Sequence, residues 1–287
     1  MEDLNALVGR SQKRSDDATA APIARLNAML DRQESDPLPG SEVPPLGHWL
    51  YFSPQARQSE IGPDGFAKRG ELLSGVDLPL RIWTGGDVDF LHPLHVEDEM
   101  VCQSQVEDVR PLDGDVDGIV VRVVRELSNA QGIAVREACS TTFMRQKLLE
   151  GFLNQRKPSP RDETFSRKIV PDSVLLFRFS ALTFDGNRLH FDRTYAMQTE
   201  KLPGLLVQGR LIAALMTDML RNHFVGGHIV RLGFRAGFPV FDDHAFEVCG
   251  KAQVDPVTGD QRVHLWARTH DGLLAMSASA VVSFPLA

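Results

Sequence analysis

A short segment of the chain gathers three side chains that could carry out proton transfer. Asp185, Asn187 and His190 form an Asp-x-Asn-x-x-His pattern, and its Asp-Gly-Asn turn follows an apolar run at 174–179 that is typical of a strand. An Asp can fix the tautomer of a His or share with it the activation of a water, while an Asn can hold either partner in place. The pattern indicates acid–base chemistry, although on spacing alone a surface turn followed by an exposed His is the commoner explanation.

The residues around this pattern resemble the signature of the MaoC-like dehydratases and the (R)-specific, type 2 enoyl-CoA hydratases, Gly-Asp-x-Asn-Pro-Ile-His-x-Asp-x-x-x-Ala. Five positions match it: Asp185, Asn187, His190, Asp192 and Ala196. Phe184 and Arg188 stand where the signature usually has Gly and Pro. Both departures are similar to those of the two-domain subgroup that includes mesaconyl-CoA and itaconyl-CoA hydratases and mitochondrial 3-hydroxyacyl thioester dehydratase.

The resemblance implies a hydro-lyase that interconverts a 2-enoyl thioester and a 3-hydroxyacyl thioester, with no cofactor and no metal. Asp185 and His190 would activate a water jointly and return its proton, with Asn187 as their orienting neighbour. Gly209, within Val-Gln-Gly-Arg-Leu, matches the backbone donor that holds the thioester oxygen in the family. A helix N-terminus has unpaired N–H groups and a favourable dipole for that charge, although Gly209 could instead serve only close packing.

Three further residues are expected to bind substrate, namely Arg81, Trp83 and Arg188. A buried Arg is costly unless an anion pairs with it, so Arg81 favours a short, polar, dicarboxylic acyl-CoA such as a mesaconyl or itaconyl thioester. Alternatively, Arg81 is solvated or pairs with a local acid such as Asp87. The competing functions are a 3-hydroxyacyl-carrier-protein dehydratase, a hotdog thioesterase and a non-catalytic acyl-thioester binder.

The elements that must position these residues are one helix and two sets of strands. Residues 205–224 carry apolar side chains at helical spacing, and Gly226-Gly227 ends that pattern. Alternating strands at 120–144 are paralleled by those at 263–284, which indicates two copies of one sheet-forming unit. A short helix at 193–200 is expected to begin at Asp192 as its N-cap.

One long helix wrapped by an antiparallel sheet is the hotdog architecture, and the resemblance implies the same fold. We therefore expect an α+β double hotdog, in which two antiparallel sheets each wrap around a long central helix. The N-terminal unit, 1–150, would lack the motif and form the acyl pocket, whereas the C-terminal unit, 165–287, would carry the motif. A polar, Pro-containing segment at 147–164 would link them, and the long loop at 54–79 is typical of a lid or binding element.

Composition bounds the remaining possibilities. The net charge of -7 argues against nucleic acid, and no apolar run approaches the roughly 20 residues that span a bilayer. The acidic start of the sequence and three scattered cysteines, without a Cys-x-x-Cys, predict a cytoplasmic protein with reduced thiols. His92 and His95 are too poorly spaced on a strand to indicate a metal site. An acyl-CoA is the expected partner, with no membrane contact, and a homodimer is expected because hotdog sheets leave edges to cover.

Overall fold

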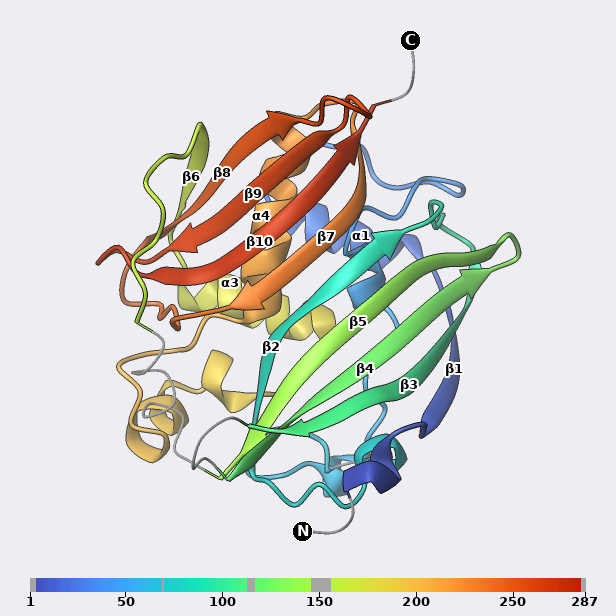
Figure 1. The fold of residues 1–287 in the computed structure, drawn as a ribbon. Helices are drawn as coiled ribbons and strands as arrows, with labels where there is room; N and C mark the ends of the chain where they lie inside the picture. Colours follow the sequence, from blue (N-terminus) through green and yellow to red (C-terminus); the bar gives the residue numbers. More distant parts are fainter. Residues whose placement is uncertain (1–3, 69, 113–116, 146–155, 285–287) are drawn as a thin grey trace.

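Ten strands form one continuous, curved, antiparallel sheet in the computed structural model, which describes residues 4–68, 70–112, 117–145 and 156–284 (Figure 1). Each half of the chain contributes five strands. Those of the first half are β1 (Ser11–Asp17), β2 (Leu80–Phe90), β3 (Glu99–Pro111), β4 (Gly118–Asn129) and β5 (Gly132–Met144). Those of the second half are β6 (Phe165–Ile169), β7 (His228–Ala236), β8 (Phe246–Val254), β9 (Gln261–Arg268) and β10 (Leu274–Ser283).

The order of the strands repeats between the halves. It runs β1-β3-β4-β5-β2-β7-β10-β9-β8-β6. The second half therefore repeats the order of the first in reverse, with β6 to β10 corresponding to β1 to β5. The hairpins β4–β5 and β9–β10 correspond, as the repeated sequence pattern predicts. Of the expected linker, residues 147–155 lie outside the described residues, and 156–164 lead into β6.

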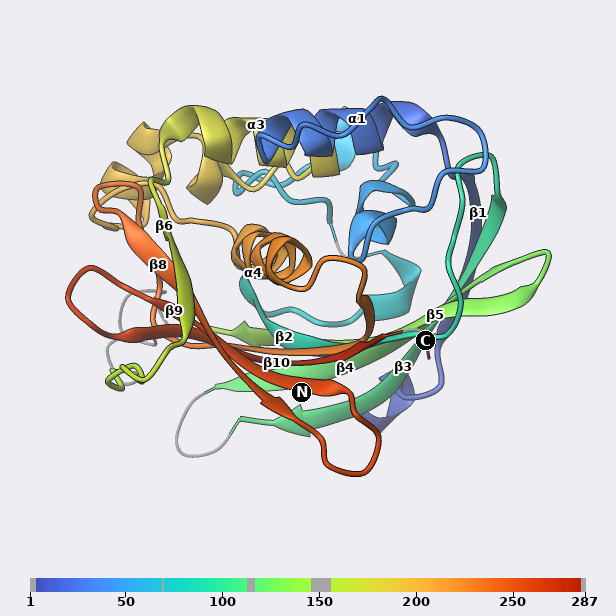
Figure 2. The same ribbon diagram turned by 90° about the horizontal axis from the view of Figure 1, so that it is seen from above.

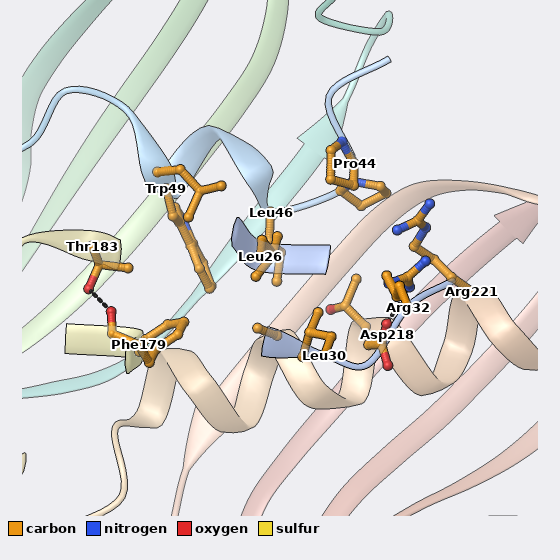
Figure 3. Close-up of a pocket in the computed structure, with 14 residues that line it drawn as sticks. Leu26, Leu30, Arg32, Pro44, Leu46, Trp49, Phe179, Thr183, Asp218 and Arg221 are labelled. Atoms are coloured by element: carbon orange, nitrogen blue, oxygen red, sulfur yellow. Dashed lines mark hydrogen bonds and ion pairs between the residues drawn. The ribbon is translucent and has the colours of Figure 1, made fainter. Parts of the chain in front are cut away.

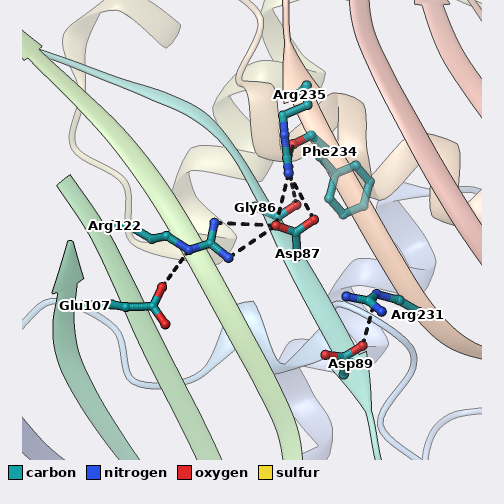
Figure 4. Close-up of polar contacts among 8 residues, drawn as sticks. All are labelled: Gly86, Asp87, Asp89, Glu107, Arg122, Arg231, Phe234 and Arg235. Atoms are coloured by element: carbon teal, nitrogen blue, oxygen red, sulfur yellow. Dashed lines mark hydrogen bonds and ion pairs between the residues drawn. The ribbon is translucent and has the colours of Figure 1, made fainter. Parts of the chain in front are cut away.

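Strands β2 and β7 join the two halves. Their antiparallel pairing places Gly85 opposite Arg235 and Asp87 opposite Gly233. A Cβ at Gly85 would lie 2.1 Å from the Phe234 carbonyl oxygen, so the close approach of the two backbones requires glycine there. Asp87 accepts hydrogen bonds from Arg235 at 3.1 and 3.2 Å and forms a longer contact with Arg122 (Figure 4). Asp87 was considered as a partner for Arg81, but its carboxylate binds Arg235 and Arg122 where the two halves meet.

The helices lie on the concave side of the sheet in two layers (Figure 2). Helix α4 (Gly209–His223) lies against the sheet, and α1 (Ala20–Met29) and α3 (Ser173–Thr183) form an outer layer above it. The helix predicted at 205–224 is thus confirmed, beginning four residues later, and its core face includes the fully buried Leu211, Met216 and Leu220. No helix in the described part of the chain is long and apolar enough to cross a membrane.

The α+β double hotdog is confirmed, with one difference between its halves. The segment that corresponds to α4 in the first half contains only short 3-10 helices, η2 (Gly47–Leu50), η3 (Gln58–Glu60) and η4 (Glu71–Leu73). The expectation of a long central helix in each half is therefore met by the second half alone, within the described residues. Pro54, four residues after Leu50, lacks the N–H that a helix continuing beyond η2 would need.

The apolar run at 174–179 is helical, so the strand predicted there is wrong. Asp172 caps the N-terminus of α3, with Oδ1 accepting a hydrogen bond from the Leu175 N–H at 2.8 Å. Leu176, Phe179 and Ser180 are buried at helical spacing. A short apolar run is compatible with either structure, and here the cap and the packing of one face decide for a helix.

Candidate active site

The segment with the Asp-x-Asn-x-x-His pattern begins where α3 ends. Phe184, the residue after the helix, adopts a left-handed conformation with φ 53°, and the Asp185 N–H donates to the Ser180 carbonyl at 2.8 Å. Glycine adopts this conformation without steric cost, which a side chain does not. The usual Gly of the signature therefore falls at the left-handed residue that ends α3 and precedes Asp185. In this chain Phe184 adopts that conformation.

His190 is held in one tautomer by the backbone. It closes the short 3-10 helix η5 (Arg188–His190), and its Nδ1 lies 2.6 Å from the carbonyl oxygen of Leu206. A carbonyl oxygen only accepts hydrogen bonds, so Nδ1 carries the proton and Nε2 keeps its lone pair. The neutral imidazole therefore presents Nε2 as a base.

Asp185 and His190 lie close together without a direct hydrogen bond. Asp185 Oδ2 is 3.9 Å from His190 Nε2, which is too long for a hydrogen bond but allows one water oxygen to contact both. The Asp185 side chain is 32% exposed and the His190 side chain 9%. The carboxylate of Asp185 is therefore accessible to an incoming water, and the imidazole of His190 is buried. This arrangement suits general base catalysis.

Asn187 connects the two members of this pair. Its Nδ2 donates to His190 Nε2 at 3.0 Å, and its backbone N–H donates to Asp185 Oδ1 at 3.0 Å. Its own Oδ1 accepts from the Leu189 N–H at 3.2 Å, which defines the orientation of the amide. Asn187 therefore contacts both side chains, Asp185 through its backbone N–H and His190 through its amide.

Gly209 is the first residue of α4, and its N–H has no partner within the helix because the bonding pattern begins later. Leu206, whose carbonyl holds His190, lies three residues before it. A Cβ at Gly209 would lie 2.8 Å from Cε3 of Trp83, so the indole packs directly on the glycine. The structure thus brings Gly209 and Trp83 together at the start of α4, linked through Leu206 to the imidazole.

Gln208 is a residue of the site that sequence reasoning missed. Its side chain is buried, and Nε2 donates to the Leu176 carbonyl and to Ser180 Oγ, each at 2.9 Å. These bonds attach the start of α4 to α3, the helix that ends at Asp185. The single sequence signal was its place before the helix start, where a polar residue is common.

A loop of the first half packs on the catalytic loop of the second. The Arg188 N–H donates to the Asp64 carbonyl at 3.0 Å, and Arg188 Nη1 donates to the Pro63 carbonyl at 2.8 Å. A Cβ at Gly65 would lie 1.8 Å from the Gly186 carbonyl oxygen. The long loop at 54–79 therefore acts through its Gly-Pro-Asp-Gly turn, which positions the loop that carries Asp185.

Arg188, predicted to bind substrate, is engaged within its own loop. Its Nη2 lies 2.7 Å from Asp192 Oδ2, and its guanidinium lies 4.2 Å from the centroid of the Tyr195 ring. Asp192 Oδ1 accepts from the Tyr195 N–H at 2.9 Å, at the start of the helical segment 193–199 that contains the π-helical turn η6 (Tyr195–Thr199). The predicted capping role of Asp192 is confirmed, and the contacts of Arg188 are those of a residue that supports the loop.

Arg81 and Trp83, the other two residues predicted to bind substrate, extend from β2 toward different neighbours. The Arg81 guanidinium stacks on Phe66 at 3.3 Å from the ring centroid, beside the loop that contacts Gly186. Trp83 packs edge to face against Trp49, with 6.3 Å between ring centroids. Trp83 is thus next to Gly209, whereas Arg81 supports the loop of the first half.

A small cavity lies between α1, α3 and α4, and none of Asp185, Asn187 and His190 lines it (Figure 3). Trp49, Phe179 and Leu26 line its apolar part, and charged residues close its other end. Those charges are paired, since Asp218 contacts both Arg32 and Arg167. The cavity follows α4 beyond Gly209, and its charged end ties α4 to neighbouring segments.

The buried imidazole predicts a specific pH dependence. Burial lowers the pKa of His190 below its usual value of 6.5, and the charge of Asp185 and the bond to Leu206 oppose this shift less strongly. We expect kcat/KM for hydration to stay constant down to pH 6.5 and to fall only below it, as Nε2 takes up a proton. A pH–rate profile measures this directly, and an acidic limb centred above pH 6.5 would contradict it.

The same shift affects stability with a defined sign. Below pH 6.5 the unfolded chain binds a proton at His190 that the folded chain does not yet bind, so the free energy of unfolding decreases as the pH falls. Urea unfolding at pH 7.5 and 5.5, compared between the wild type and His190→Gln, isolates this contribution. A loss on acidification that is equal in both proteins would show that His190 does not cause it.

Together these features define a class of enzyme. An acid–base pair that can hold a water lies near the start of a helix that can stabilise an oxyanion, on a double hotdog. Water addition to, or removal from, an acyl thioester needs those groups. Among the residues described, no cluster of three or more His, Cys, Asp or Glu side chains could hold a metal ion. The chain is a hydro-lyase of acyl thioesters.

Comparison with known proteins identifies the family. The family model for hydroxyacyl-thioester dehydratase type 2 matches residues 46–242, and the chain belongs to this family. It is 31% identical to mesaconyl-C(4)-CoA hydratase of Chloroflexus aurantiacus over 278 residues, covering 96% of this chain and 97% of that protein. Identity to the mitochondrial hydroxyacyl-thioester dehydratase type 2 of Schizosaccharomyces pombe is 23%, covering 84% and 91%. A solved MaoC-like dehydratase superposes with a TM-score of 0.74 at 13% identity, covering 98% and 100%, and shares the fold.

Proposed function

We propose that this protein hydrates a short dicarboxylic 2-enoyl-CoA, such as mesaconyl-C(4)-CoA, to the corresponding 3-hydroxyacyl-CoA, and catalyses the reverse reaction. The observation that carries the chemistry is the 3.9 Å separation of Asp185 Oδ2 and His190 Nε2, near the start of α4. The choice of substrate is supported by the likeness to mesaconyl-C(4)-CoA hydratase over nearly the whole chain.

In the proposed mechanism, Asp185 and His190 hold the attacking water between them, and the water replaces the Asn187 amide as the hydrogen-bond donor to His190 Nε2. As its oxygen bonds to C3 of the enoyl group, its proton moves to the pair, and the C2–C3 π electrons move toward the thioester carbonyl. The Gly209 N–H stabilises the resulting enolate oxygen, helped by the N-terminal end of α4. The pair then returns a proton to C2, which completes the 3-hydroxyacyl product and restores both side chains.

The two halves would divide this work. We propose that residues 165–287 form the catalytic unit and that residues 1–150 form the acyl side of the site through Trp83 and Trp49. The packing of Trp83 on Gly209 supports this division, because it brings a first-half side chain to the position where the thioester carbonyl would bind.

The function is tested by separating the products formed from mesaconyl-C(4)-CoA and from crotonyl-CoA. We expect the hydroxyacyl-CoA from both, with the higher kcat/KM for the dicarboxylic substrate. Free CoA would instead identify a thioesterase, and unchanged substrate with measurable binding would identify a non-catalytic binder. Activity on the same acyl group attached to a carrier protein, at ten-fold higher kcat/KM, would show that the carrier-linked thioester is preferred.

We propose that the protein assembles as a homodimer through the outer face of α3. Val174 and Phe177 are 62% and 58% exposed there, and Phe184 beyond the helix end is 66% exposed. Light scattering should give twice the 31.8 kDa chain mass for the wild type and one chain mass for Phe177→Glu. Val257→Glu, on a turn at 90% exposure, is the matched control and should remain dimeric. A wild-type mass of one chain at micromolar concentration would refute the dimer.

The proposed compartment is the cytoplasm. Cys102, Cys139 and Cys249 are all free and buried. Unpaired thiols are typical of a reducing compartment, which supports this assignment.

A further inference from the structure

Arg210, the second residue of α4, is a cation for which the described residues provide no ion-pair partner. Its side chain is half-buried, and its guanidinium lies 5.3 Å from the centroid of the Trp49 ring. It makes no ion pair or hydrogen bond within the described part of the chain. Four other arginines near the helices are paired with acids: Arg32 and Arg167 with Asp218, Arg188 with Asp192, and Arg193 with Asp242.

The nearest buried carboxylate does not need Arg210 as its partner. Glu137 accepts a hydrogen bond from Trp49 Nε1 at 2.9 Å and lies 3.5 Å from Arg125 and 3.7 Å from His48. Arg210 acts on it only as a more distant charge. The indole of Trp49 therefore separates a satisfied acid from a guanidinium that retains its capacity to bind an anion.

The position of Arg210 relates it to the proposed carbonyl site. It directly follows Gly209, on which Trp83 packs, and Trp83 in turn contacts Trp49 edge to face. A guanidinium stacked on an aromatic face is partly dehydrated and keeps its planar donors free for a carboxylate. In a short dicarboxylic enoyl thioester, the distal carboxylate is only a few bonds from the thioester carbonyl. A single substrate could therefore contact Gly209 and Arg210 together.

We propose that Arg210 binds the distal carboxylate of the dicarboxylic acyl group and so determines the preference for an acidic substrate. This inference rests on the proposed function. The geometry favours Arg210 over Arg81 for this role, because Arg81 stacks on Phe66 and has further contacts within the protein. Arg188 is likewise engaged, with Asp192.

The test compares Arg210→Gln, Arg210→Lys and the wild type with mesaconyl-C(4)-CoA and crotonyl-CoA. We expect Arg210→Gln to lower kcat/KM for the dicarboxylic substrate by about 10- to 100-fold, mainly through KM, as loss of a charged hydrogen bond predicts. Its kcat/KM for crotonyl-CoA should change by less than about three-fold, because that substrate has no distal carboxylate to lose. Arg210→Lys should retain an intermediate preference, because it keeps the charge without the planar fork.

Arg25→Gln, on the exposed face of α1, is the matched control, because it removes the same charge away from the site and should leave both substrates unaffected. An equal loss for both substrates in Arg210→Gln, or no loss for either, would overturn the assignment while leaving the hydratase activity established. A wild type that hydrates neither substrate would overturn the proposed function instead. Should Arg210→Gln not fold, as judged by circular dichroism, Arg210→Lys decides: an unchanged ratio of the two kcat/KM values would reject the assignment.

Discussion

Replacing Asp185 with Asn, or His190 with Gln, should lower the rate of hydration by about 10²–10⁴-fold, the usual contribution of a general acid–base group. Asn keeps the acceptor for the Asn187 N–H, and Gln can still donate toward the Leu206 carbonyl. The fold should therefore persist, with a nearly unchanged Tm. Single-turnover rates with crotonyl-CoA and a thermal melt of each variant provide the measurement.

The chain provides its own control for this experiment. Asp243 and His244 form a second Asp–His contact, at 3.1 Å, with side chains that are 43% and 52% exposed. Asp243→Asn and His244→Gln make the same chemical changes at the surface and should leave the rate unchanged. Near-native rates in Asp185→Asn and His190→Gln would mean that the signature has only a structural role in this chain.

Gly65→Ala should lower kcat/KM by about 10²-fold, although residue 65 belongs to the half without the catalytic motif. The added methyl would lie 1.8 Å from the Gly186 carbonyl oxygen, so the loop between Asp185 and His190 must move. A displacement of about 1 Å in a catalytic group can cost that much activity. Steady-state kinetics of the folded variant measures the effect.

Gly40→Ala is the matched control, because it isolates the displacement from backbone strain. Gly65 and Gly40 have φ of +86° and +79°, so alanine carries a similar conformational cost at both, but no atom lies within 4 Å of a Cβ at Gly40. Both variants should lose stability through backbone strain, Gly65→Ala by more because of its contact with Gly186, and only Gly65→Ala should lose activity. Equal activity in the two would show that the contact between the halves does not position the site.

The parts of the structure that could be predicted from sequence depend on local patterns. The helical spacing at 205–224 predicts α4, and the alternation at 120–144 and 263–284 predicts the corresponding hairpins. The Asp-x-Asn-x-x-His pattern predicts neighbours because its members lie within six residues of one another. In each case the interacting groups are close in the chain, so residue type and spacing carry the information.

The features that could not be predicted depend on contacts between distant segments. The packing of Gly65 on Gly186 and the bonds from Gln208 to α3 join segments that no local pattern relates. The contact of the Arg210 guanidinium with the Trp49 ring likewise joins residues that are far apart in the sequence. The strand predicted at 174–179 is part of helix α3, because a short apolar run does not show which of its faces the rest of the protein will cover.

The first half has the short η2 turn where the second half has α4. This difference affects how the substrate specificity of such a site can evolve. In an assembly of identical single hotdogs, one gene encodes both partners, so any substitution that enlarges the acyl side also alters the helix that bears the oxyanion donor. Two copies in one chain mutate separately. The first copy can lose its helix and acquire residues such as Trp49 for a new acyl group, while the second keeps the helix that catalysis needs. Substrate range can thus diverge without an accompanying loss of catalytic power.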